Sequence, residues 1–266
     1  MRILISLVFI LFTTSSFAVT FEGKFIQGSF ILGKTDPGSE VFIDKKKVKV
    51  TSDGFFAFGL SRDRKYDVVI TLNKDGNKQK IVKKVLKRKY NIQKIDGLEE
   101  KKVTPPEEVY ERIKRENKWI GEARAIDSSL TFFTKKFIIP VENAIISGVY
   151  GSQRILNGKL KWPHYGLDFA ADEGTKIKAM LDGKVTLAEP DLFYTGGTLI
   201  FDHGHGISTL YMHIEKILVK NGQKVKQGDI IGTVGSTGRA TGAHLDVRLN
   251  WFQTRLDPMT VLDIKD

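Results

Sequence analysis

The sequence predicts a mostly β protein with two β-rich domains and one connecting helix. The chain has 266 residues, of which 41% are hydrophobic and 27% charged, and this suits a globular protein large enough for two modest cores. Short alternating runs between turn signals fill residues 19–100, and glycine-punctuated strand-like runs fill residues 137–266. Between them, residues 101–136 contain apolar side chains at helical spacing.

The N-terminal β region is predicted to be a small antiparallel sandwich of the Ig-like type. The turn sequences TDPG, SDG and KDG at 35–38, 52–54 and 74–76 separate the apolar runs EVFID, KVKV, FFAFGL and YDVVITL. Short strands at close spacing with Gly and Asp turns are typical of such a sandwich. Residues 19–100 contain no histidine and no motif that indicates chemistry.

The stretch VTPPEEVYERIKRENKWIGEARAI predicts the connecting helix. Thr104 and Glu107 form a capping box, and Pro105 suits the first helical position. Apolar side chains recur at helical spacing further along, so we expect this face to pack on a neighbouring domain. These side chains are Val109, Ile113 and Ile120.

Residues 1–18, MRILISLVFILFTTSSFA, predict a secretory signal peptide. Arg2 precedes an apolar run, and Ser16 and Ala18 stand at small-residue cleavage positions. The run is about half of the roughly 20 apolar residues that a membrane span needs, so we expect no integral membrane segment after signal removal. The chain has no cysteine, which excludes disulfides and a lipid-modified cysteine. We therefore expect an exported protein of the periplasm or cell envelope.

Positive charge is concentrated at residues 74–102, within a chain of net charge +11. This region holds eleven Lys or Arg against four acids. Such a patch often binds nucleic acid, but an exported protein rarely meets it, and the region lacks interleaved stacking aromatics. Two interpretations remain open: contact with anionic envelope polymers, or solvent-facing and edge-strand lysines that discourage sheet-to-sheet pairing.

All five histidines lie in the C-terminal β region, where metal or acid and base chemistry is therefore expected. His164 and Asp168 are four apart in HYGLD, His213 ends LYMH, and His244 and Asp246 stand in AHLD. Imidazole and carboxylate are suitable zinc ligands, and a catalytic zinc typically takes three protein ligands and one water.

Other chemistries have less support in the sequence. There is no cysteine nucleophile and no GxSxG elbow. The glycine-rich VGSTGRATG lacks the lysine and the following helix of a phosphate loop, so it is interpreted as a structural turn. His203 and His205 in DHGHG are expected at a glycine-rich turn, without a direct role.

Three motifs together resemble a known family. HYGLD, LYMH and GRATGAHLD occur in this order, with VKQGDIIG between the last two. In this order they are similar to the M23 family of zinc metallopeptidases, also called the LytM or lysostaphin-type peptidases, over roughly residues 137–262. The resemblance implies a mostly antiparallel β domain that bears a groove and hydrolyses peptide bonds in peptidoglycan stems or cross-bridges.

The resemblance also implies roles for five residues. His164 and Asp168 match the first two zinc ligands, and His213 matches a catalytic histidine near the bound water and the scissile carbonyl. His244 matches the other catalytic histidine, the first of the family's HxH. The third ligand of the family is the second histidine of HxH, and this chain has Asp246 there.

The sequence leaves two interpretations of Asp246 open. Residues two apart on a strand share a face, so Asp246 could be the third ligand or a salt-bridge partner of Arg248. Arg248 could alternatively reach carboxylates of the substrate. Aspartate can bind zinc, but two carboxylates and one imidazole form a harder ligand set that favours zinc less strongly over manganese.

Three functions follow as hypotheses. The first is an exported metalloendopeptidase acting on peptidoglycan. The second is a non-catalytic LytM-type domain that binds the cell wall or activates a wall amidase. The third makes the N-terminal sandwich and its basic edge the main functional unit, as a polymer-binding module.

Overall fold

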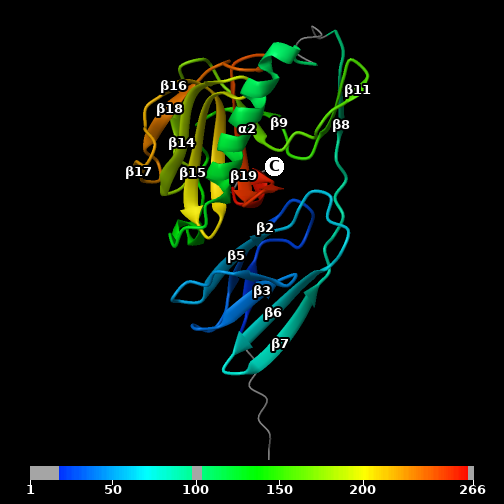
Figure 1. Cartoon of the computed structure of the whole chain (residues 1–266), viewed down its shortest axis with the longest axis vertical. Coiled ribbons are helices and arrows are strands. Elements are labelled where there is room, and N and C mark those ends of the chain that lie inside the picture. The colour runs from blue at the N-terminus through cyan, green and yellow to red at the C-terminus, as the bar shows by residue number, and fades with distance from the viewer. Residues whose placement is uncertain (1–17, 98–103, 263–266) are drawn as a thin grey trace, which may run out of the picture.

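The structure is a computed structural model that describes residues 18–97 and 104–262. The predicted signal peptide, except for Ala18, lies outside the described residues. In Figure 1 the N-terminal region (blue to cyan) lies below the C-terminal sheet, and a long helix runs along that sheet. The protein is mostly β, so the predicted fold class is confirmed.

The N-terminal region forms two antiparallel sheets, in the orders β1-β2-β5 and β4-β3-β6-β7. The predicted turn sequences connect its strands, and β6 alternates buried and half-buried side chains as a strand with one covered face should. The bounds are β1 (Thr20–Glu22), β2 (Phe30–Lys34), β3 (Glu40–Ile43), β4 (Lys46–Val48), β5 (Phe55–Gly59), β6 (Val68–Lys74) and β7 (Asn77–Lys83). An Ig-like class and the predicted domain boundaries stay predictions.

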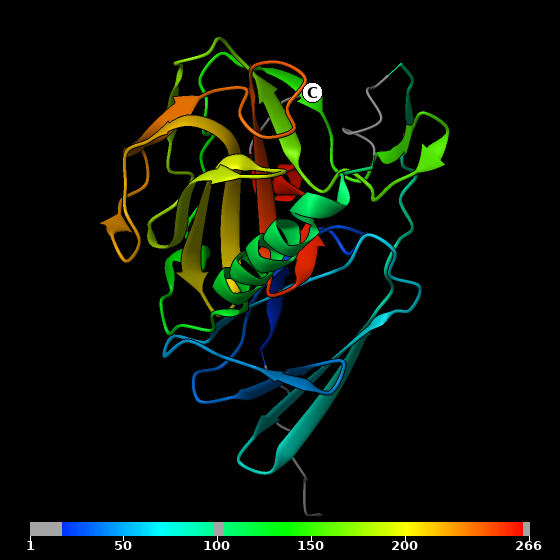
Figure 2. The ribbon, with the colours of Figure 1, turned by 45° about the horizontal axis from the view of Figure 1, so that its top comes forward.

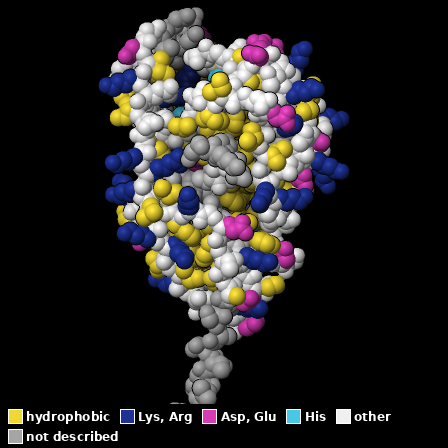
Figure 3. Space-filling model, turned by 180° about the vertical axis from the view of Figure 1, so that it is seen from behind, with side chains coloured by type: hydrophobic (Ala, Val, Ile, Leu, Met, Phe, Trp, Pro, Cys, Tyr) yellow, Lys and Arg dark blue, Asp and Glu magenta, His cyan; other side chains and the backbone are white. Residues whose placement is uncertain are grey.

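The basic stretch begins at Lys74, the last residue of β6, and continues along the edge strand β7, which is the last of its sheet. Lys78 and Lys80 are exposed there, as the edge-strand interpretation expects. Figure 3 shows many Lys and Arg side chains (dark blue) over the lower part of the molecule as well. Contact with anionic envelope polymers stays a prediction.

The C-terminal region is built on a ten-stranded sheet with the path β17-β14-β15-β16-β19-β12-β9. Strand β18 pairs with β13 and β16, and β20 pairs with β19. The bounds are β9 (Ile145–Gly148), β12 (Leu167–Ala170), β13 (Lys176–Lys178), β14 (Gly183–Leu192), β15 (Gly196–Gly204), β16 (Ile207–Ile217), β17 (Lys224–Val225), β18 (Ile230–Val234), β19 (His244–Trp251) and β20 (Thr254–Leu256).

A third, small sheet joins distant parts of the chain. Strand β8 (Ile92–Ile95) pairs in parallel with β10 (Gln153–Leu156), which pairs with β11 (Lys159–Leu160). Strand β8 falls in the range predicted for the N-terminal sandwich, yet its partner belongs to the C-terminal region. Figure 1 shows β8 and β11 together beside the C-terminal sheet.

The connecting helix α2 (Tyr110–Ala125) follows a 3₁₀ turn, η1 (Glu107–Val109). The predicted capping box at Thr104 was wrong: Val109 stands at the N-cap, without a side-chain hydrogen bond. A residue before proline is disfavoured in the α conformation, so Pro105 could not open a helix in front of Pro106, which itself stays extended.

The predicted docking of this helix is confirmed. The helix lies across the C-terminal sheet (Figure 2). Ile120 packs on a small buried cluster that consists of Ala123 of the same helix and of the sheet residues Leu187, Leu192, Ile200, Leu210 and Met212. The remaining short helices are η2 (Phe132–Thr134) and η3 (Pro258–Thr260). Within residues 18–97 and 104–262, no helix has both the length and the apolar character required to cross a membrane.

The main hydrophobic core is continuous across the N-terminal and C-terminal regions, whereas the sequence predicted two separate cores. Glycines allow the two regions to approach closely. A Cβ at Gly59 would lie 2.5 Å from the Leu256 side chain, and one at Gly28 would lie 2.7 Å from the Tyr150 ring. The two regions therefore share one packed interior.

Two arginines of the N-terminal half make polar contacts across this interface. Arg62 donates from Nε and Nη2 to the carbonyl of Gly151, at 2.9 and 2.7 Å. Arg88 pairs with Asp257, whose side chain is almost fully buried and also caps η3. Because a buried carboxylate needs a partner, the second contact should matter for stability.

We expect Arg88→Ala to lower the free energy of unfolding by roughly 2 kcal/mol, below the 3–5 kcal/mol typical of a fully buried pair because Arg88 is partly exposed. Urea unfolding measures the change. Lys118→Ala breaks an exposed helix pair with Glu122 and should cost less than about 0.5 kcal/mol. Equal effects of the two substitutions would contradict the importance of the Arg88 contact.

Candidate functional site

Two aspartates face each other across neighbouring strands. In the antiparallel pair β12 and β19, Asp168 is directly opposite Asp246, and side chains opposite each other on a strand pair point to the same face with neighbouring Cβ atoms. Both side chains are buried. Two buried like charges at this distance require positive charge beside them.

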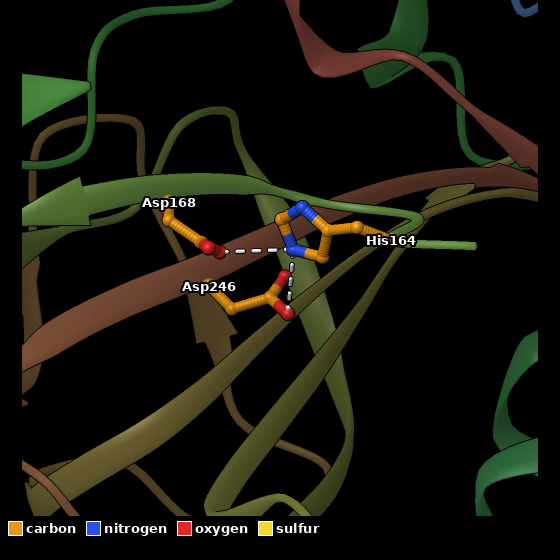
Figure 4. Close-up of side chains that lie close together, drawn as sticks. All are labelled: His164, Asp168 and Asp246. Carbon is orange, nitrogen blue, oxygen red and sulfur yellow. Dashed lines mark hydrogen bonds and ion pairs between the residues drawn. The ribbon is translucent and has the colours of Figure 1, made fainter. Parts of the chain in front are cut away.

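His164 supplies the first positive group. Its Nε2 lies 3.0 Å from Oδ1 of Asp168 and 3.4 Å from Oδ2 of Asp246 (Figure 4). Burial alone would lower the pKa of His164, but the two carboxylates raise it to about 9. The other ring nitrogen, Nδ1, lies 3.3 Å from the carbonyl of Val149, which directs Nε2 toward the aspartates.

Arg248 supplies the second positive group beside the two aspartates. Its Nη2 donates to Oδ2 of Asp246 at 2.9 Å, and its Nε contacts Oδ1 at 3.3 Å. Burial would raise the pKa of Asp246, but Arg248 and His164 together hold it well below the usual range. The salt bridge that the sequence suggested therefore exists, and the same carboxylate also faces His164.

Two glycines make room for the carboxylates. A Cβ at Gly166 would lie 1.9 Å from Oδ1 of Asp246, and one at Gly148 would lie 2.1 Å from Oδ2 of Asp168. Any larger residue would push a carboxylate out of the cluster. His164, Asp168 and Asp246 thus offer three ligand atoms that all lie within 4.8 Å of one another.

Two further histidines lie beside this cluster. The rings of His213 and His244 have their centroids 4.8 Å apart. Nδ1 of His213 lies 2.8 Å from the carbonyl of Thr237, and Nδ1 of His244 lies 2.8 Å from the carbonyl of Gly242. With Nδ1 donating, each Nε2 carries the lone pair. Burial lowers the pKa of His213, which keeps the ring neutral.

The site opens into a groove of about 350 Å³. Asp168, Asp246, His213 and His244 line it together with residues 239–243 and side chains of β8 and β10. In Figure 3 the histidines (cyan) appear only as small areas in the upper part of the molecule, near Lys and Arg side chains. His213 is buried and His244 is partly buried, so the two catalytic candidates are recessed.

His203 and His205 lie away from this groove. The chain turns between β15 and β16 at His205, which has a positive φ of 52°, as the glycine-rich motif predicted. His203 is buried: Nδ1 lies 2.7 Å from the carbonyl of Asp182, and Nε2 lies 2.7 Å from the Thr209 hydroxyl. Both contacts are structural.

The sequence analysis missed parts of the surroundings of this site. The structure brings together all six candidates: His164, Asp168, His213, His244, Asp246 and Arg248. Their functional roles stay predictions. The loop at 235–243, interpreted as a turn, also holds His213 through Thr237 and places Arg239 in the groove. Arg239 is part of the motif GRATGAHLD, and this position in the sequence could have identified it as a residue of the site.

Comparison with known proteins identifies a protein family for the C-terminal β region. Residues 162–258 match the family model described as Peptidase family M23. The peptidoglycan DD-endopeptidase ShyA of Vibrio cholerae is 45% identical over 87 residues, which are 33% of this chain and 20% of ShyA. The DD-carboxypeptidase/endopeptidase Mpg of Neisseria meningitidis is 40% identical over 89 residues, 33% of this chain and 20% of Mpg. This chain thus spans about a fifth of the length of these relatives.

A solved structure extends the likeness beyond that region. A crystal structure of a Pseudomonas aeruginosa protein, described as a candidate peptidase M23, superposes with a TM-score of 0.70 at 28% sequence identity. The alignment covers 90% of this chain and 95% of that one. The C-terminal β region of this chain is therefore a domain of peptidase family M23, and the resemblance predicted from the motifs is confirmed.

The buried His203 predicts a loss of stability in acid. Burial lowers its pKa to about 4, against about 6.5 in an unfolded chain. The unfolded state therefore binds more protons between these values, and stability falls as the pH drops below 6.5. This histidine alone should cost about 2 kcal/mol between pH 7 and pH 5. Urea unfolding measures the total, and NMR titration isolates the ring; titration of His203 near pH 6.5 would contradict the prediction.

Proposed function

We propose that this protein is an exported metalloendopeptidase that hydrolyses peptide bonds in peptidoglycan stems or cross-bridges. The observation that carries the proposal is the buried group of His164, Asp168 and Asp246, whose ligand atoms lie within 4.8 Å of one another. The pair of His213 and His244 beside it supports a hydrolytic role. The relatives named as peptidoglycan endopeptidases support this substrate.

The donor set fits a divalent metal ion. Nε2 of His164 and one oxygen from each aspartate converge, and imidazole and carboxylate are ligands that zinc and manganese accept. Arg248 does not exclude this, because a carboxylate oxygen has two lone pairs. Its guanidinium instead resembles an outer-shell group that orients a ligating carboxylate. Zinc is the proposed ion, with manganese as the alternative that the second carboxylate favours.

The chemistry that a bound divalent ion supplies is polarisation of the scissile carbonyl and acidification of water. His213 accepts the proton of the attacking water at Nε2, because burial keeps this ring neutral and Thr237 fixes its tautomer. The hydroxyl adds to the carbonyl carbon, the C–N bond breaks, and the leaving amine takes up the proton. His244, on the same face of β19 as Asp246, carries a lone pair at Nε2 and can accept this proton from His213 and pass it to the leaving amine.

Metal analysis tests the ligand assignment. The purified chain should bind one divalent ion per molecule, and Asp246→Asn should lose it because the amide carries no charge. Arg248→Gln should keep the ion but bind it about 10- to 100-fold more weakly, as expected for an outer-shell group. Asp75→Asn, at an exposed turn far from the site in sequence, is the matched control. Tight binding by Asp246→Asn would remove Asp246 from the ligand set.

Activity tests the enzyme itself. The protein loaded with zinc or manganese should release fragments from cell-wall sacculi, and His213→Ala should lower the rate about 10²- to 10⁴-fold, as loss of a general base does. Near-native thermal unfolding of the variant serves as the folding control. A folded, loaded wild type that releases nothing with either ion would refute the proposal.

A non-catalytic role is the second candidate, and one observation favours it. Arg248 contacts both oxygens of Asp246, so the carboxylate already has a cationic partner. Under this alternative the domain binds the wall or activates a wall amidase, no stoichiometric metal is present, and function survives His213→Ala. Loss of wall-related function in His213→Ala would count against it.

A further inference from the structure

Three arginines lie on the face of the C-terminal sheet that carries the candidate metal ligands, where helix α2 ends against it. Arg255 of β20 is directly opposite Asn250 of β19, and Arg248 is two residues before Asn250 on the same face. Arg124, in the last turn of α2, donates from Nη2 to the carbonyl of Phe252, in the turn between β19 and β20, at 3.2 Å. The fold therefore gathers three positive charges at one place.

Two of these arginines have no acidic partner in the part of the chain that the structure describes. Arg248 is paired with Asp246. Within residues 18–97 and 104–262, the Arg255 side chain has no hydrogen-bond, ion-pair or ring partner. Arg124 is only 3% exposed, and its Nε has no hydrogen-bond partner among the described residues. A buried charged donor without an acceptor is costly, so this place lacks an anion.

The charges at this place are unbalanced. Burial lowers the pKa of Arg255, and the charges of Arg124 and Arg248 lower it further. Asp246 opposes this lowering of the pKa with a smaller effect than either arginine has. Burial, and after it the charge of Arg248, lowers the pKa of Arg124 to about 10. Guanidinium groups stay protonated at neutral pH, so the three repel one another, and a carboxylate between Arg124 and Arg255 would relieve the repulsion.

A ligand can reach this place from solvent. Arg255 and Tyr165 are half-buried, and 21% of the Arg248 side chain is exposed. Burial raises the pKa of Tyr165, whereas the charges of Arg255 and Arg248 oppose the rise, so the phenol lies within electrostatic range of both. Asp63 also acts on this phenol, but it is already paired with Arg62 at 2.6 Å.

We infer that Arg255 and Arg124 bind a carboxylate of the substrate peptide, so that the site selects peptides with an acidic residue at one position. A guanidinium presents a planar pair of donors that matches a carboxylate, and the hydroxyl of Tyr165 is a third donor. The inference rests on the proposed peptidase function, because it names a feature of the same substrate.

The strand register sets how far this acidic residue lies from the scissile bond. Asn250, opposite Arg255, is four residues along β19 from Asp246, which is about 13 Å at roughly 3.3 Å per residue. An extended peptide covers a similar distance per residue, and the long arginine side chain can shorten the span. The recognised residue should therefore lie about two to four positions from the scissile bond.

Thermal unfolding of the unliganded protein is the first test. Arg255→Gln removes a charge that has no partner among the described residues, so Tm should rise by about 2–4 °C. Arg62→Gln removes an arginine with two hydrogen bonds to Gly151, and as the matched control it should lower Tm. A fall in Tm for Arg255→Gln like that of the control would show a structural role and overturn the inference.

NMR detects anion binding directly, without turnover. Acetate is the probe, acetamide is its neutral counterpart, and chloride holds the ionic strength constant. The Nε–H signals of Arg255 and Arg124 should shift saturably with acetate and not with acetamide, and the signal of the exposed Arg115 on α2 should not shift. Arg255→Lys keeps the charge but loses the paired donors, so it should weaken acetate binding. Unshifted signals of Arg255 and Arg124 would overturn the inference.

Cleavage tests the assignment to the substrate. Two synthetic peptides share one scissile bond and differ at one residue, which is Glu in one and Gln in the other, placed in turn at each nearby position. At one position the metal-loaded wild type should cleave the Glu peptide with a kcat/KM about 10- to 100-fold higher, as expected for hydrogen bonds to a charged group. Arg255→Gln should remove this preference, chiefly through KM, whereas the exposed Arg115→Gln should retain it.

The two measurements separate this inference from the proposed function. No preference for Glu at any position would overturn the assignment to the substrate. A wild type that cleaves neither peptide, while acetate still shifts the signals of Arg255 and Arg124, would count against the proposed function and support the anion site.

Discussion

The register of β12 and β19 is the constraint on which the site depends. It sets Asp168 directly opposite Asp246, a pairing of like charges that is unfavourable unless positive groups lie beside it. His164 approaches from the loop before β12, and Arg248 approaches from two residues further along β19. Gly148 and Gly166 leave the space that the carboxylates occupy. A shift of one residue would send Asp246 to the opposite face.

Much of this site could be predicted because it depends on local periodicity. The alternation of a strand places His244, Asp246 and Arg248 on one face, and all three residues lie on the strand β19. The choice between a metal ligand and a salt bridge for Asp246 could not be made from spacing. In the structure the salt bridge is present, because Arg248 contacts both oxygens of this carboxylate, and Oδ2 also lies 3.4 Å from Nε2 of His164. The role of Asp246 as a metal ligand stays a proposal.

The parts that could not be predicted depend on contacts between distant segments. The parallel pairing of β8 with β10 joins residues about 60 positions apart, and neither strand carries a local sign of its partner. The shared core has a similar origin: Gly28 and Gly59 look like ordinary turn or strand glycines until Tyr150 and Leu256 lie against them. The helix start failed for a local reason, because the second proline outweighed the capping box.

These distant contacts tie the N-terminal region to the site. Gln93 contributes to the groove wall, and Arg62 holds the carbonyl of Gly151. The backbone N–H of Gly151 in turn donates to the carbonyl of His164 at 2.7 Å. Movement of the N-terminal region would therefore change both the width of the groove and the support of a candidate ligand. The sheets of the N-terminal region, which contain no histidine, are in this way part of the framework of the site.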